Sequence, residues 1–238
     1  METQQAISQL QQFREELYQR LKARPDALLD LLDALSGSPN ARSVVELSLS
    51  PLFRREYSSI TDAIDQFFPA SQPDQAETER QAWNKDLARL IGSYLPTPQA
   101  RRFWLLGTDV VPVSRAFART LEDRAFVYQP NPVGSNKPVT IGHQYSVLAF
   151  LPEKGQPDDQ PWVVPLSVQR VQSGEKARAV GAEQLKTLLQ DDRQPFQAGL
   201  CVQVADSAYS GASYLGRVGA ERNLVSVTRA PDNRVFYR

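Results

Sequence analysis

The stretch CVQVADSAYSGASYLGRV (residues 201–218) decides how the second half of this chain is expected to fold. An alternating apolar run, Val202, Val204 and Ala205, is typical of a strand with one buried face, and it stops at a carboxylate, Asp206. Small residues and a helix-like segment follow. Such an acid is either a solvated strand end or a carboxylate held for chemistry. A second acid in a matching place is needed to separate the two interpretations.

The first apolar run of the same half, RFWLLGTDVVP (residues 102–112), is predicted to be a strand that ends at an acid, Asp109. A right-handed crossover through a helix at 179–190 would lay the later strand parallel to an earlier one. If that earlier strand is the first, Asp109 and Asp206 emerge at the same edge of the sheet. Two neighbouring carboxylates repel each other, and a divalent cation relieves the repulsion. Hard oxygen ligands suit Mg²⁺ or Mn²⁺.

The order of the predicted elements is that of an RNase H-like α/β domain with a mixed sheet and helices. Three strands come first, and a fourth is interrupted by Pro165, which places it at an edge or a bulge. The strands are expected over residues 102–112, 125–130, 144–152, 161–171, 199–206 and 223–231, and the helices over 179–190 and 210–221. Other α/β domains also end strands with Asp, so the pattern alone does not distinguish the RNase H-like fold from these other folds.

The first half of the chain has the period of helices. They are expected over residues 3–22, 25–37, 58–68 and 80–95, with a short additional helix capped by Ser43. Short capped helices within residues 43–68 are what a helix-turn-helix needs, and Arg54 and Arg55 would grip DNA phosphate ahead of its last helix. A plain packed helical bundle is the alternative.

A domain boundary is expected in YLPTPQARR (residues 94–102), which has two prolines and no apolar period. We therefore predict an all-α helical domain over residues 1–98 and the α/β domain over residues 99–238.

Composition and charge support a globular protein that meets an anionic partner. Apolar residues make up 41% of the 238 residues, and the single cysteine, Cys201, excludes a disulfide framework. Residues 1–100 carry 10 Lys and Arg against 14 Asp and Glu, whereas residues 101–238 carry 17 against 13. The longest apolar runs are too short to span a bilayer, so no membrane partner is expected. Trp104 and Trp162 are expected in core strands.

Three stretches resemble the DDE-type transposases of bacterial, especially cyanobacterial, insertion sequences. They are SVVELSLSPLFRREYSSITDAI at 43–64, TDVVPVSRAFARTLEDRAFVYQPNPVGSNKPVTIGHQYSVLAFLPE at 108–153 and VADSAYSGASYL at 204–215. The resemblance covers about residues 10–238. It implies an RNase H-like catalytic domain that cuts double-stranded DNA at transposon ends and joins the 3′-hydroxyl to target DNA.

The resemblance implies that Asp109 and Asp206 are catalytic and hold the Mg²⁺ or Mn²⁺ ions, which activate water and then the hydroxyl. The third acid of the family is a Glu on a helix well after the strand at 223–231. Glu221 precedes that strand and does not match. We therefore expect a catalytic domain that lacks the segment with the third acid, which makes this chain a truncated, incomplete or inactive copy.

Other residues are candidates for DNA contacts. Arg115 and Arg119 follow Asp109 closely and are expected to line a DNA groove. Lys137, in GSNKP, would touch DNA, although a solvated loop is the simpler explanation. His143, in TIGHQYS, would lie near the metal site or the scissile phosphate, and its alternative is a turn residue before a strand.

Two further functions stay open from the sequence. One is a non-catalytic DNA-binding protein derived from a transposase, and the other is an α/β phosphohydrolase that uses Asp109 on small phosphates. The absence of a second acid two residues after Asp109 and of a phosphate loop counts against the phosphohydrolase. A homodimer and a cytoplasmic, nucleoid-associated location are expected of a transposase.

Overall fold

The computed structural model divides the chain into two compact units, Met1–Leu90 and Ile91–Arg238. It describes residues 2–41, 43–67, 73–128, 138–155, 158 and 160–231, with only the backbone of residues 2 and 73–77. The boundary falls inside a helix, whereas the sequence placed it in the proline-containing segment that follows.

The first unit contains helices α1 to α4 and most of α5. Their bounds are Glu2–Arg20, Pro25–Gly37, Val44–Ser48, Tyr57–Phe67 and Pro73–Ser93. The Ser43 hydroxyl accepts a hydrogen bond from the Glu46 N–H at 3.2 Å, which confirms the predicted cap of α3. No helix in the described ranges has the length and apolar content needed to cross a bilayer.

The second unit is built on one mixed sheet. Its strands are β1 (Trp104–Ser114), β2 (Ala125–Tyr128), β3 (Val139–Phe150), β4 (Val164–Val171), β5 (Cys201–Ala205) and β6 (Leu224–Thr228), and its helices are α6 (Ala177–Leu189) and α7 (Ala212–Val218), with short 3₁₀ turns η1 (Pro195–Ala198) and η2 (Ser207–Tyr209). The strand order is β2-β3-β1-β5-β6, and β4 pairs with β3. Strand β3 is antiparallel to both β1 and β4. Strands β1, β5 and β6 all run parallel to one another.

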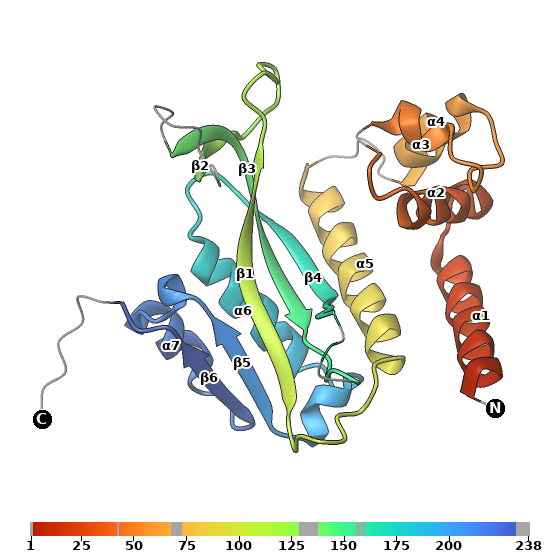
Figure 1. Cartoon of the computed structure of the whole chain (residues 1–238). Coiled ribbons are helices and arrows are strands. Elements are labelled where there is room, and N and C mark those ends of the chain that lie inside the picture. The colour runs from red at the N-terminus through yellow and green to blue at the C-terminus, as the bar shows by residue number, and fades with distance from the viewer. Residues whose placement is uncertain are drawn as a thin grey trace, which may run out of the picture. The chain divides into compact units, whose positions relative to one another are not determined.

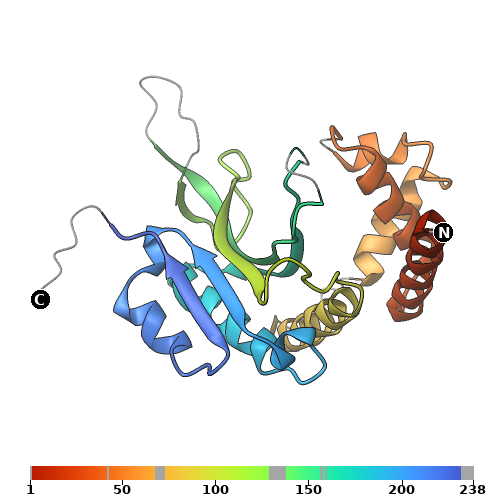
Figure 2. The ribbon, with the colours of Figure 1, turned by 60° about the horizontal axis from the view of Figure 1, so that its bottom comes forward.

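Helices α6 and α7 lie on the same face of this sheet (Figures 1 and 2). That face buries the main core, in which Trp104 and Leu106 of β1 meet Leu185 of α6 and Tyr214 of α7. The alternation of buried and less buried residues along β1 and β5 follows from the period of two in a strand. The mixed α/β sheet with helices is consistent with the RNase H-like arrangement predicted from the sequence.

Strand β4 is irregular where the sequence predicted an edge or a bulge. Its register with β3 shifts between Leu148 and Ala149, so that Leu166 is left out of the pairing between Pro165 and Ser167. Pro165 has no N–H to give to the ladder, which explains why the irregularity falls at this point.

Several predicted bounds were wrong. Strand β1 continues past Asp109 to Ser114, so the acid does not end the strand. Strand β3 begins at Val139, because residues 139–142 pair with β2 and residues 142–150 pair with β1. His143 is therefore a strand residue and not a turn residue. Trp162 lies before β4 with 54% of its surface exposed and is not a core residue, whereas Trp104 is buried in β1 as predicted.

Gly181 sets how closely α6 approaches the sheet. A Cβ atom at this position would lie 3.1 Å from Thr108 Cγ2, 3.2 Å from Tyr209 Cε1 and 3.3 Å from Ser146 Oγ. We expect Gly181→Ala to lower the free energy of unfolding, because overpacking costs about 1–3 kcal/mol and outweighs a helix-propensity gain of about 1 kcal/mol.

Urea denaturation measures this change, with Gly216→Ala in α7 as the matched control. A Cβ at Gly216 meets nothing within 4 Å, so this variant should be as stable as the wild type or more stable. Equal stability of the two variants would show that α6 has room to spare at Gly181.

Candidate active site

Asp109 and Asp206 lie on neighbouring strands at matching positions. Strands β1 and β5 pair in parallel, and their last paired residues are Thr108 and Ala205. Asp109 is the next residue of β1, and Asp206 is the residue that follows β5, so their backbones are separated by one strand spacing, about 4.8 Å. Both acids are exposed. The structure thus brings together the two carboxylates that the sequence singled out.

The turn after β5 fixes the orientation of Asp206. Its Oδ1 accepts a hydrogen bond from the Ala208 N–H at 2.9 Å, and Asp206 is thereby the N-cap of η2. The backbone of Asp206 is extended, with φ −72° and ψ −176°. The cap needs one carboxylate oxygen, which leaves Oδ2 for a ligand.

A buried polar layer lies under this edge. The hydroxyls of Thr108, Ser146, Tyr209 and Tyr214 are all buried without a well-formed hydrogen bond among the described residues. The two tyrosine rings make an edge contact, with centroids 5.0 Å apart. The Tyr209 side chain lies within reach of Ser146, and the Tyr214 side chain lies within reach of Thr108, so the four groups form two pairs within this layer.

Electrostatics link one of these tyrosines to both acids. Burial raises the pKa of Tyr209 above its ordinary range, and the charges of Asp109 and Asp206 raise it further, while the nearby Ser146 side chain lowers it. Burial raises the pKa of Tyr214 to about 12, and Thr108 opposes that shift. Both phenols therefore stay protonated at neutral pH and act as hydrogen-bond donors.

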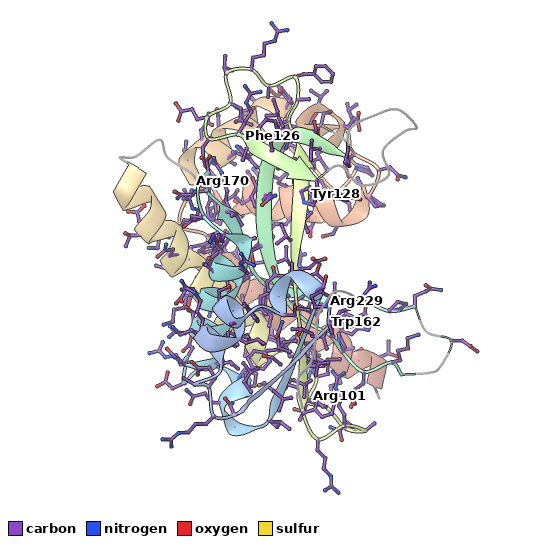
Figure 3. All side chains as sticks on the ribbon, turned by 90° about the vertical axis from the view of Figure 1, so that its left-hand side faces the viewer. Arg101, Phe126, Tyr128, Trp162, Arg170 and Arg229 are labelled. Carbon is purple, nitrogen blue, oxygen red and sulfur yellow. The ribbon has the colours of Figure 1, made fainter. Side chains whose placement is uncertain are left out.

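An arginine that the sequence reasoning missed stands at the same edge. Strands β5 and β6 are parallel, and Ala205 pairs with Thr228, so Arg229 aligns with Asp206. The Arg229 N–H donates to the Ala205 carbonyl at 3.3 Å, and the exposed side chain follows the strand end (Figure 3). The sequence did contain a signal for Arg229. The residue comes directly after the strand run LVSVT, just as Asp206 comes directly after the strand run CVQVA.

The arginines that follow Asp109, which the sequence predicted to contact DNA, lie away from the two acids. Arg115 is six residues beyond Asp109 along an extended strand, about 20 Å away. Arg119 belongs to the loop that follows, where its carbonyl accepts from Arg124. The structure does not bring either arginine to the acid pair, and Lys137 lies outside the described residues.

His143 supports that loop and does not face the acids. It is buried, and its Nε2 lies 3.0 Å from the Glu122 carbonyl oxygen. Beside it, Arg170 of β4 forms an ion pair with Asp123 at 2.5 Å, and Asp123 accepts from the Ser173 N–H. In Figure 3, Arg170 lies near Phe126 and Tyr128 at the upper end of the sheet, away from Arg229.

In the first unit, Arg54 and Arg55 both bind one buried acid. Arg54 Nη2 lies 2.7 Å from Asp30 Oδ1, and Arg55 Nε lies 3.1 Å from Asp30 Oδ2. The Asp30 side chain is only 4% exposed. These arginines therefore join α2 to the segment before α4. Their predicted contact with DNA phosphate stays a prediction.

Asp109 and Asp206 are the residues here that suit a divalent cation. They offer hard carboxylate oxygens on adjacent, rigid strands, and one carboxylate is oriented by its cap. Within the described ranges there is no group of three or more His, Cys, Asp or Glu residues placed to hold a metal ion. Cys201 is no reactive ligand, because burial raises the pKa of its thiol to about 12.

A mixed sheet with α6 and α7 on one face and two carboxylates at the edge of parallel strands has the form of a nuclease domain. Comparison with known families agrees with this class. Residues 16–238 match the family described as DDE superfamily endonuclease, and the chain belongs to that family. No curated protein matches the sequence significantly. Family membership implies DNA as the substrate and the use of divalent metals, which such endonucleases typically require.

The ion pairs of Asp30 give a prediction for the first unit. Removing both arginines, Arg54→Ala with Arg55→Ala, leaves the Asp30 carboxylate buried and unpaired. An uncompensated buried charge costs about 3 kcal/mol, so we expect the urea midpoint of the unit to fall clearly.

The matched control is Asp62→Ala, which removes an exposed ion pair with Arg24 whose carboxylate side chain is 54% exposed. Such a pair contributes at most about 1 kcal/mol. If the double variant matched this control in stability but lost DNA affinity, the arginines would serve DNA and not the fold.

Proposed function

We propose that this chain is a transposase that cleaves DNA phosphodiester bonds with a divalent metal and transfers the 3′ ends to target DNA. The observation that carries the proposal is the register of β1 and β5, which sets Asp109 and Asp206 side by side. Family membership supports DNA as the substrate. The further proposal that the DNA is a transposon end rests on the stretches around Asp109 and Asp206, which resemble those of insertion-sequence transposases.

In this proposal Asp109 and Asp206 hold Mg²⁺ or Mn²⁺ through their exposed carboxylate oxygens. When bound, the cation neutralises the scissile phosphate and lowers the pKa of water. The Ala208 N–H keeps Asp206 oriented, and the strand keeps Asp109 in place. Arg229, aligned with the acids, binds a phosphate oxygen of the DNA backbone.

A non-catalytic DNA-binding protein is the second candidate. One observation favours it. The described residues bring Asp109 and Asp206 together, but they contain no group of three or more His, Cys, Asp or Glu residues that could hold a metal ion. Glu221 does not complete the site. It follows α7 at the start of β6, opposite to the end that carries Arg229, and its carboxylate accepts from Gln190 at 2.8 Å.

Substituting the acids separates the two candidates. We expect Asp109→Asn and Asp206→Asn each to reduce Mn²⁺-dependent cleavage of duplex DNA by about 100-fold or more, since a metal supplies several kcal/mol to such reactions. Asn caps helices as well as Asp does, so Asp206→Asn should keep its fold. Plasmid nicking in Mn²⁺ measures the effect.

Glu221→Gln is the control, because it changes an acid at the other end of the same sheet and should cleave as the wild type does. A wild-type chain that binds DNA but cuts none in Mn²⁺ or Mg²⁺ would favour the non-catalytic candidate. Cleavage that survives both Asp substitutions would refute this site.

Arg229 gives a separate prediction on DNA affinity. We expect Arg229→Ala to weaken binding to all duplex sequences alike and to reduce the slope of log K against log salt by about one. Arg222→Ala is the matched control, since Arg222 is also exposed but precedes β6. Fluorescence anisotropy at several salt concentrations measures both, and equal slopes for the two variants would remove Arg229 from the interface.

A further inference from the structure

Tyr209 stands out because it is buried, polar and three residues after Asp206. Only 2% of its surface is exposed, and its hydroxyl has no well-formed hydrogen bond among the described residues. The residue ends η2, the 3₁₀ turn that Asp206 caps. Any movement of Tyr209 therefore passes directly to the Asp206 carboxylate.

The ring of Tyr209 reaches the strand that carries the other acid. A Cβ atom at Gly181 would lie within 3.3 Å of Tyr209 Cε1, Thr108 Cγ2 and Ser146 Oγ, so these three atoms surround one point. Thr108 is the residue before Asp109, and Ser146 of β3 pairs with Val110, the residue after it. Tyr209 thus packs against the residue before Asp109, while its backbone N–H donates to the Asp206 carbonyl at 3.2 Å.

We infer that Tyr209 is a positioning residue for the carboxylate pair: its ring packs against Thr108 and its hydroxyl lies beside Ser146, so that it fixes the separation of Asp109 and Asp206. The inference rests on the proposed function, since it gives that site a further part. Groups that orient metal ligands commonly change metal affinity by about 10- to 100-fold.

Tyr214 provides a matched control within the same buried layer. It is a second buried tyrosine in the same layer, it contacts the ring of Tyr209, and its hydroxyl is also without a well-formed hydrogen bond. Tyr209 belongs to the turn that Asp206 caps, whereas Tyr214 belongs to helix α7. The two residues therefore share the packing role and differ in their link to the acids.

The experiment measures Mn²⁺ binding to the full chain without DNA, by the loss of the free Mn²⁺ signal in electron paramagnetic resonance. We expect Tyr209→Phe to raise the dissociation constant about tenfold, and Tyr214→Phe to change it less than about twofold. Urea denaturation of both variants reports the packing role, which should be similar in the two.

Two results separate the possible failures. If the wild type binds Mn²⁺ and loses it on Asp206→Asn, but Tyr209→Phe binds as the wild type does, the inference is wrong and the proposed site stands. If the wild type binds no Mn²⁺, or if Asp206→Asn binds equally well, the proposed function fails and the inference fails with it.

A second variant keeps the inference open to test if Tyr209→Phe does not fold. Ser146→Ala removes the hydroxyl beside Tyr209 from β3 without touching the turn that carries Asp206. It should weaken Mn²⁺ binding in the same direction by several-fold, and unchanged binding in a folded Ser146→Ala variant would overturn the role assigned to this layer.

Discussion

The parallel hydrogen bonding of β5 to β1 is the constraint on which the second unit depends. Antiparallel neighbours can be joined by a tight turn, but a parallel neighbour needs a crossover, and α6 supplies the helix that packs under the sheet. That packing requires a close approach, which Gly181 permits. The same register then decides the chemistry, because it places Asp206 and Arg229 in line with Asp109.

Much of this arrangement could be predicted from residue patterns. The alternation in CVQVA, the helix expected at 179–190 and the right-handed crossover predicted that the later strand lies beside an earlier one. If that earlier strand was the first, the acids would meet, and the structure does pair β5 with β1. What could not be predicted was how far β1 extends. Asp109 interrupts an apolar run and so resembles a strand end, but pairing with β3 continues on the other side of β1 to Ser114. Pairing between distant segments, unlike local alternation, leaves no mark within one stretch.

The same limitation explains the misplaced DNA contacts. Arg115 is near Asp109 in sequence and far from it in space, because an extended strand separates them. Arg229 is far from both acids in sequence, but it follows β6, the neighbour of β5, and is aligned with Asp206. His143 was ambiguous for another reason, since its partner, the Glu122 carbonyl, belongs to a loop whose path the sequence does not reveal. The burial of Tyr209 depends on α6 and β3 together, so the sequence alone does not reveal it.

The irregular strand β4 has a consequence for how this protein behaves at high concentration. An edge strand offers a row of N–H and C=O groups to any other strand, including one from a second copy, and regular edges of this kind seed aggregates. The register shift at Leu166 interrupts the regular row of groups along β4. This edge is therefore a poorer template for a second strand than a regular edge would be.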